Sequence, residues 1–82
     1  MSDEALAKRF GALVRGLRLQ RGLSQERFGE VSGLHRTYIG MVERGETNVT
    51  LATAYKLAGA LGLGLSSILA ELERTSEGRD GG

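Results

Sequence analysis

Apolar residues in this sequence recur at steps of three and four along five segments, four of which end at a glycine. The first segment, residues 4–21, carries Leu6, Phe10, Leu13, Val14 and Leu17. This spacing is the period of an amphipathic helix, and the Gly22–Leu23 pair that follows is typical of a C-terminal cap. Four further segments show the same pattern, none alternates like a strand, and the chain has no proline. We therefore predict an all-α domain of five helices around one core.

Capping residues set the expected limits of the other helices. Ser24 and Thr50 are good N-caps for the second and fourth helices, and Ser66 opens the fifth. Gly33 and Gly45 separate the second helix from the third and the third from the fourth. The side chains expected to face the core from these helices are Phe28, Val31, Leu34, Ile39, Val42, Leu51, Ala54, Leu57, Ala58, Leu61, Ile68 and Leu69.

The length and composition indicate one small domain. The chain of 82 residues can bury a modest core. We expect the folded domain to span residues 1–75 and residues 76–82 to form a disordered tail, because SEGRDGG offers no apolar side chain to bury. No apolar run reaches the roughly 18 residues of a membrane span, and the start MSDEALAKRF lacks the features of a signal peptide. The expectation is a soluble, cytoplasmic protein without membrane contact.

The same composition argues against catalysis. The absence of cysteine and the single histidine exclude disulfides and His/Cys metal cages. There are no paired carboxylates in an apolar setting and no glycine loop that could hold a phosphate, so no nucleophile and base can act together. We therefore expect no enzyme activity, no cofactor, no metal ion and no small-molecule ligand.

Positive charge is concentrated in the middle of the chain. The formal net charge is only +1, but six arginines between Arg15 and Arg44 stand against three glutamates, a local excess of three positive charges. The seven other acidic residues lie near the two ends and at Glu46. This distribution favours a nucleic-acid partner for one side of the domain, with a solvated surface of mixed charge as the alternative.

The spacing of the second and third helices is the most informative motif. Two helices of about eight residues joined at Gly33 leave no room for a longer loop, so the pair must cross steeply. Gly29 supplies a small residue where the two backbones approach. A recognition helix carries hydrogen-bonding side chains into the DNA major groove, whereas an ordinary bundle would place Glu and Lys on this face. The outward face of the third helix is expected to hold Arg36, Thr37, Gly40, Met41 and Arg44.

At these residues the sequence resembles a known family. The segment Leu13 to Leu69 is similar to phage-repressor and Cro-like helix-turn-helix proteins, and GLSQERFGEVSGLHRTYIGMVERGETNVTL is similar to controller proteins of restriction-modification systems. The resemblance implies a lambda-repressor-like domain that binds a partly palindromic double-stranded DNA operator as a homodimer and acts as a repressor, an activator or both. Glu46 and Thr47 depart from the family pattern, since relatives often carry a basic residue there.

Three residues of the third helix are expected to contact bases. Arg36 has the donor fork that pairs with guanine O6 and N7, and the alternative is a phosphate contact or a solvated arginine. Thr37 could touch a base edge or a thymine methyl, or belong only to the first helical turn. Met41 lies on the same face, although it cannot read a base edge by polar hydrogen bonds.

A second group is expected to contact the DNA backbone. Gln25 can donate to a phosphate at the start of the second helix. Tyr38 can reach a phosphate with its hydroxyl while its ring packs on the domain, and Arg44 lies at the end of the same helix. Asn48 takes a backbone-contacting position by the resemblance, with a plain turn-forming asparagine as the alternative. His35 completes the group, and an ordinary surface histidine is its alternative.

The resemblance also implies a structural ion pair. Arg18 in the first helix would hold Glu43 at the end of the third through charge-assisted hydrogen bonds. The alternative is that both side chains are solvated. If the two residues pair, Arg18 is not available to contact DNA.

The fifth segment offers more apolar side chains than closing so small a core requires. We expect Ile68 and Leu69 to face inward and Leu65 and Leu72 to be exposed in a monomer, where a second copy would cover them. The predicted dimer interface therefore comprises Leu65, Ile68 and Leu72. The competing function is an antitoxin-type module that binds a toxin and regulates its own operon.

Overall fold

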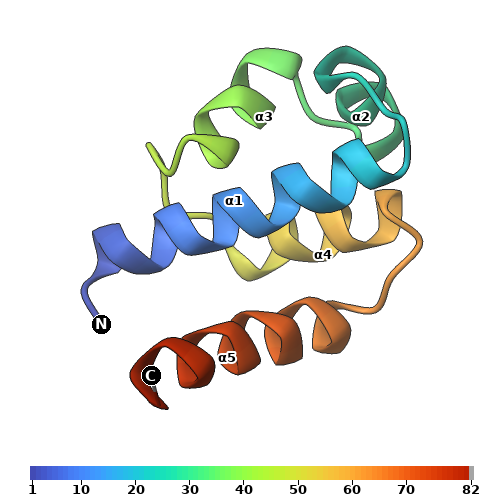
Figure 1. The fold of residues 1–82 in the computed structure, drawn as a ribbon. Helices are drawn as coiled ribbons and strands as arrows, with labels where there is room; N and C mark the ends of the chain where they lie inside the picture. Colours follow the sequence, from blue (N-terminus) through green and yellow to red (C-terminus); the bar gives the residue numbers. More distant parts are fainter. Residues whose placement is uncertain (82) are drawn as a thin grey trace.

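The computed structural model describes the backbone of residues 1–81 and the side chains of residues 1–74. The prediction of an all-α domain of five helices is confirmed, and that part of the chain contains no strand. The helices are α1 (Asp3–Gln20), α2 (Gln25–Ser32), α3 (Arg36–Glu43), α4 (Leu51–Ala60) and α5 (Leu65–Gly81) (Figure 1).

The limits of α5 differ from the expected ones. The helix begins at Leu65, one residue before the predicted Ser66. Its backbone is helical to Gly81, whereas the sequence predicted a domain ending at residue 75 and a disordered tail over residues 76–82. Gly82 and the side chains of residues 75–81 lie outside the described residues, so disorder of the tail stays a prediction.

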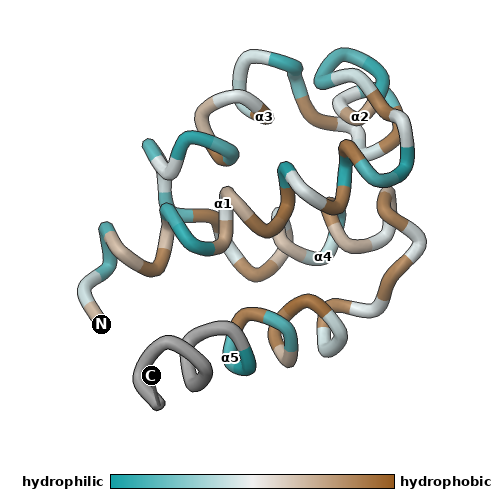
Figure 2. The backbone as a smooth tube through the Cα atoms, in the orientation of Figure 1, coloured by the Kyte–Doolittle hydropathy of each residue, from teal (hydrophilic) through white to brown (hydrophobic). Residues whose placement is uncertain are grey.

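α1 runs through the middle of the molecule. α2 and α3 lie on one side of it and α5 on the other, and α4, which runs behind α1 in this view, contacts both α2 and α5 (Figure 1). Hydrophobic residues are prominent along α4 and the start of α5, whereas α2 and the end of α3 are more hydrophilic (Figure 2). The helix pair α2–α3 therefore carries the polar side of the domain. The largest fully buried side chains between the layers are Val14, Phe28, Ile39, Val42, Leu57 and Ile68.

Gly29 and Gly11 allow backbones to approach more closely than any side chain would permit. A Cβ atom at Gly29 would lie 2.5 Å from the carbonyl oxygen of Leu34, so the close approach predicted at this residue is present. A Cβ atom at Gly11 would lie 2.1 Å from the carbonyl oxygen of Val42, where α1 crosses α3. The sequence pattern did not identify Gly11 because its partner belongs to a different helix. The approach at Gly11 fixes α3 against α1, and the approach at Gly29 fixes the turn before α3 against α2.

Three residues predicted to face the core are exposed instead. Val31 is 47% exposed, Leu51 72% and Leu69 42%. The buried position in α2 is Ser32, whose hydroxyl donates to the carbonyl oxygen of Phe28 at 2.7 Å. Ser32 lies one turn from both Phe28 and Gly29, while Val31 points away from Gly29. The close approach at Gly29 therefore decides which face of α2 is buried.

Candidate nucleic-acid interface

The start of α3 is defined by a turn and a histidine cap. Gly33 has a φ of 76°, a left-handed conformation that glycine adopts without strain. Nδ1 of His35 then accepts a hydrogen bond from the Thr37 N–H at 3.0 Å. This bond requires a neutral imidazole with its proton on Nε2. α3 consequently begins at Arg36, directly after the turn from α2.

The outward face of α3 carries the three residues predicted to contact bases. The Arg36 side chain is 64% exposed, Thr37 is exposed and Met41 is half-buried. The opposite face of α3 is anchored in the core by Ile39 and Val42, which are 0% and 1% exposed. The helix therefore presents a polar face to solvent while its other face is fixed. Contact of the three side chains with bases stays a prediction.

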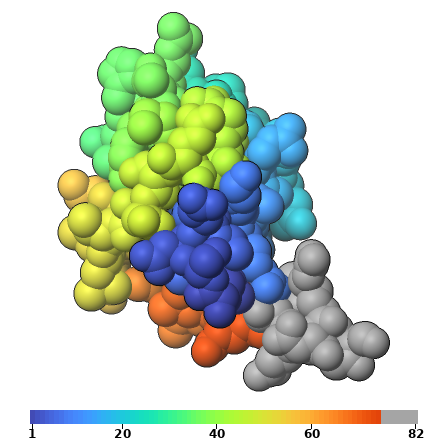
Figure 3. Space-filling model, turned by 90° about the vertical axis from the view of Figure 1, so that its left-hand side faces the viewer, coloured from blue at the N-terminus to red at the C-terminus, as the bar shows by residue number. Residues whose placement is uncertain are grey.

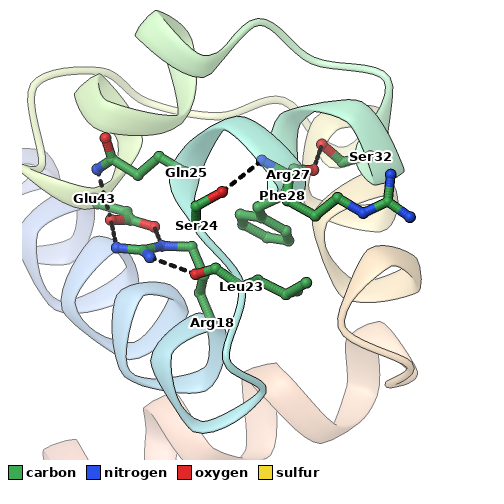
Figure 4. A network of polar contacts seen from close by, with 8 residues as sticks. All are labelled: Arg18, Leu23, Ser24, Gln25, Arg27, Phe28, Ser32 and Glu43. Atoms are coloured by element: carbon green, nitrogen blue, oxygen red, sulfur yellow. Dashed lines mark hydrogen bonds and ion pairs between the residues drawn. The ribbon is translucent and has the colours of Figure 1, made fainter.

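A buried polar network fixes the end of α3 (Figure 4). Arg18 Nε donates to Glu43 Oε2 at 2.6 Å, and Arg18 Nη2 donates to Glu43 Oε1 at 3.0 Å. The side chains of Arg18 and Glu43 are only 8% and 2% exposed. Arg18 Nη1 also donates to the carbonyl oxygen of Leu23 at 2.7 Å. The ion pair implied by the resemblance is present, and it joins α1, α3 and the loop that leads into α2.

Gln25 belongs to the same network. Its Nε2 donates to Glu43 Oε1 at 3.1 Å, and its side chain is half-buried (Figure 4). An amide NH₂ group has two N–H donors, so this bond uses one and leaves the second for another acceptor. Sequence reasoning assigned Gln25 to a phosphate alone and did not anticipate its bond to Glu43.

Five of the six arginines of the basic segment fall into two classes. Arg18 and Arg21 serve the fold: Arg21 Nε donates to the carbonyl oxygen of Leu61 at 2.6 Å, at the end of α4. Arg27, Arg36 and Arg44 each lie beside an exposed carboxylate. The excess of three positive charges counted between Arg15 and Arg44 therefore overstates the positive charge that α2 and α3 can offer to DNA.

Arg36 and Arg44, the exposed arginines at the two ends of α3, each have an acidic partner that the sequence did not predict. Arg36 Nη1 lies 3.4 Å from Glu26 Oε2 of α2. Arg44 donates to both carboxylate oxygens of Glu46, from Nε and from Nη2, at 3.0 Å each. The hydrogen bond to Glu46 raises the pKa of Arg44, and the same hydrogen bond lowers the pKa of Glu46. The spacing of Arg44 and Glu46 around a glycine was the only signal for this pair in the sequence.

The other predicted backbone contacts lie around this face. Tyr38 is half-buried and packs against the core, as expected of its ring. Asn48 is exposed in the loop between α3 and α4. His35 is exposed at the start of α3. Contact of Gln25, His35, Tyr38, Arg44 and Asn48 with phosphates stays a prediction.

The prediction for α5 assigned two leucines to the wrong sides. Leu72 is 9% exposed within the single chain, whereas Leu69 is 42% exposed. Ile68, also named for the dimer interface, is 1% exposed, and Leu65 is half-buried. Ile68 and Leu72 lie one turn apart on the face that packs against the domain, and Leu69 is rotated away from it.

An apolar groove lies on the face where the starts of α1 and α4 meet α5 (Figure 3). Leu6, Leu51 and Leu69 line it and are 45%, 72% and 42% exposed. Leu65 and Leu72 also contribute to its wall. This face is separate from the polar face of α3.

The described residues offer neither a metal site nor a single membrane-spanning helix. No group of three or more His, Cys, Asp or Glu side chains there could hold a metal ion. No single helix in the same part of the chain has the length and apolar character to cross a membrane, although α4 and residues Leu65–Arg74, bent by 99°, have them as a pair.

Comparison of the sequence with known protein families agrees with the observed fold and its pair of short helices, α2 and α3. Residues 14–68 match the family model described as helix-turn-helix. The chain belongs to the helix-turn-helix family. Control protein C.SmaI of Serratia marcescens is 55% identical over 56 residues, which cover 68% of this chain and 67% of that protein.

Solved structures extend the likeness to three dimensions. The restriction-modification controller protein C.AhdI from Aeromonas hydrophila superposes with a TM-score of 0.76 and 45% identity, covering 78% of this chain and 97% of that one. The controller protein C.Esp1396I, solved as a tetramer with its natural 35 base-pair operator, gives a TM-score of 0.79 at 26% identity, covering 84% and 91%. These helix-turn-helix relatives are named as regulators, not as enzymes.

Proposed function

We propose that this chain is a sequence-specific DNA-binding transcription regulator of the restriction-modification controller type. The observation that carries the proposal is the outward face of α3, which is polar and exposed while the helix itself is fixed by the core and by the Arg18–Glu43 pair. A rigid helix with an exposed donor fork at its first turn suits insertion into the major groove. The operator complex of C.Esp1396I supports this function for a similar fold.

In this proposal Arg36, Thr37 and Met41 face the bases. Arg36 would form a bidentate contact with a guanine once it leaves Glu26, its exposed partner at 3.4 Å. Gln25 would donate its second amide hydrogen to a phosphate while the first stays on Glu43. His35 would donate from Nε2 because its Nδ1 is occupied by the helix cap.

The proposed functional unit is a homodimer on a partly palindromic operator. A single recognition helix reads only a few base pairs, and two helices about 34 Å apart read two half-sites one DNA turn apart. A second copy of this chain would cover the apolar groove and bury Leu6, Leu51 and Leu69. This revises the predicted interface, because Ile68 and Leu72 are already buried within one chain.

Light scattering tests the dimer. Wild type should be dimeric at tens of micromolar, and Leu69→Glu with Leu51→Glu should be monomeric and folded because both side chains are exposed in a single chain. Val31→Glu is the matched control, since Val31 is 47% exposed on α2, away from the groove. A monomeric wild type, or a double variant that dimerises normally, would rule out the groove as the interface.

The DNA-binding function is tested by selecting duplexes from a random library and footprinting the product. A dimer that meets about six phosphates should give a log-log salt slope near −5. Selection of no sequence, together with a slope near zero, would overturn the proposal. The competing antitoxin-type function would then gain support, and co-purification with a toxin encoded by a neighbouring gene would test it directly.

We assign no catalytic role, cofactor or small-molecule ligand to the chain. A regulator of this type acts where the DNA is, in agreement with the cytoplasmic location expected from the sequence. The direction of regulation depends on where the operator lies relative to the promoter, so transcription assays on the selected operator would distinguish repression from activation.

A further inference from the structure

His35 supplies two hydrogen-bond acceptors to the first turn of α3. Its Nδ1 accepts the Thr37 N–H at 3.0 Å, and its backbone carbonyl oxygen accepts the Ile39 N–H at 3.1 Å. The N-caps of α1, α2 and α4 are serine or threonine, which are common at this position. Their hydroxyl groups do not titrate, whereas an imidazole does. α3 is therefore capped by a side chain that loses its acceptor when it gains a proton.

The capped turn carries two of the residues proposed to contact bases. Arg36 and Thr37 are the first two residues of α3, and both are exposed. The first fully buried side chain of the helix is Ile39, so the turn before it depends on backbone contacts and on the cap. Loss of an N-cap acceptor destabilises the first turn of a helix. The His35 cap therefore helps to hold the two base-facing side chains in a helical arrangement.

The charged groups around His35 are paired with one another. A hollow lined by His35 also has Glu26 and Glu30 of α2 and Arg36 of α3 in its wall. Glu26 Oε2 lies 3.4 Å from Arg36 Nη1. Glu30 Oε1 lies 3.2 Å from Arg27 Nη1, so each carboxylate already has a cation beside it. The hydrogen bond to Thr37 is therefore the contact that distinguishes a neutral imidazole from a protonated one at this place.

We propose that His35 is a positioning residue that makes sequence reading by α3 depend on pH. The inference rests on the proposed DNA-binding function. Histidine side chains ordinarily change charge between about pH 5 and pH 8. Above this range the neutral ring caps α3 and holds Arg36 and Thr37 toward the bases. As pH falls through the range, Nδ1 gains a proton and the cap is lost.

Protonation of His35 acts differently on two kinds of binding. Nε2 carries a proton in both states, so the proposed contact with a phosphate persists and gains a positive charge. That contact carries no sequence information. The loss of the cap, in contrast, releases the side chains that face the bases. A fall in pH therefore lowers the preference for the operator but not the affinity for DNA in general.

The test measures the ratio of the affinities for the selected operator and for a scrambled duplex, between pH 8 and pH 5.5 at constant salt. For wild type this ratio should fall by about three- to tenfold, the effect of losing an N-cap, while affinity for the scrambled duplex should not fall. His35→Asn keeps an accepting side chain that does not titrate, so its ratio should stay at the wild-type pH 8 value throughout. His35→Ala has no acceptor, so its ratio should be low at every pH.

His35→Asn is also the matched control for other titrating groups. The chain has no second histidine, and the variant keeps the N-terminal amine and every carboxylate. The lost phosphate contact should weaken its binding to both duplexes alike and cancel in the ratio. A wild-type ratio that does not change with pH would overturn the inference. An equal change in His35→Asn would overturn it as well.

NMR tests the cap without DNA. In wild type at pH 8, Nδ1 of His35 should be unprotonated, and the Thr37 amide should be more protected from hydrogen exchange than in His35→Ala. At pH 5.5 this extra protection should disappear. A proton on Nδ1 at pH 8, or equal protection in the two proteins, would overturn the inference whatever the binding data. A wild type that shows the cap but selects no sequence would instead refute the proposed function, and the inference with it.

Discussion

Glu43 and Arg44 are consecutive residues at the end of α3, yet their ion pairs serve opposite purposes. Both pairs are bidentate, with Arg18 inside the domain and with Glu46 outside it. The Glu43 side chain is 2% exposed and the Arg44 side chain 58%. The buried Arg18–Glu43 pair also bonds Gln25 and the Leu23 carbonyl oxygen, and it sets the position of α3. The second is open to water and can exchange its partner for DNA.

Burial, not pairing chemistry, separates the structural ion pair from the exposed one in this domain. A buried carboxylate that loses its partner has no water to replace it, so removal of one partner is strongly destabilising. An exposed pair is screened by water and salt and contributes little to stability. The same residue types can therefore hold a helix in place or remain available to a ligand.

The largest expected effect is on the buried pair. Arg18→Ala should lower the free energy of unfolding by about 3–5 kcal/mol, because it leaves the Glu43 carboxylate buried and unpaired. Urea unfolding followed by circular dichroism measures this change, with Arg44→Ala as the control that should unfold close to wild type. If Arg18→Ala and Arg44→Ala were equally stable, the distinction by burial would be wrong. Arg18→Met with Glu43→Met should recover much of the loss.

The next largest effect is a loss of DNA binding with no change in stability. Arg36→Ala should weaken binding to the selected operator by about 1–3 kcal/mol and relax the preference at one base pair of each half-site. Its urea midpoint should match wild type because Arg36 and Glu26 are both exposed. Competition titrations with operator and random duplexes make the measurement. An equal loss on both kinds of DNA would show that Arg36 does not read a base.

Gln25 is expected to contribute both to stability and to DNA binding. Gln25→Ala should lower the free energy of unfolding by about 1 kcal/mol, because Glu43 loses a half-buried hydrogen bond. It should also weaken binding to all duplexes alike, because a phosphate contact carries no sequence information. Parallel unfolding and binding titrations separate the two effects. A change in base preference would contradict the phosphate role.

The smallest effect is a pH response of the exposed pair. The hydrogen bond from Arg44 lowers the pKa of Glu46, so the pair's contribution is present above the usual glutamate range and is lost as pH falls through the lowered value. Titration of the Glu46 carboxyl by NMR should show a midpoint that rises in Arg44→Ala. The unfolding midpoint should change little over the same range because the pair is exposed. An unchanged Glu46 midpoint in Arg44→Ala would mean that the pair does not form in solution.

Local patterns in the sequence were sufficient for the helices and for the outward face of α3. Helical spacing of apolar residues, N-caps such as Ser24 and the turn at Gly33 are read within a few residues along the chain, so they need no knowledge of distant partners. The face of α3 followed in the same way, because Ile39 and Val42 mark its inward side.

Long-range contacts decided what the local patterns left open. Ser32 is buried in place of Val31 because the close approach at Gly29 sets the rotation of α2. Leu72 is buried in place of Leu69 because of the rotation in which α5 packs on α1 and α4. Gln25 gained a second role because Glu43, distant in the sequence, lies beside it in the fold.

The sequence by itself determined five helices, the N-caps Ser24 and Thr50 and the polar outward face of α3, since these depend on neighbours within one or two turns. Only the tertiary structure decided which arginines are available to DNA. Arg18 lies one turn after the buried Val14 in α1, but only the tertiary structure places Glu43 beside it, whereas Arg44 at the end of α3 stays exposed. Burial depends on how α1 crosses α3 at Gly11, a contact between segments far apart in the chain.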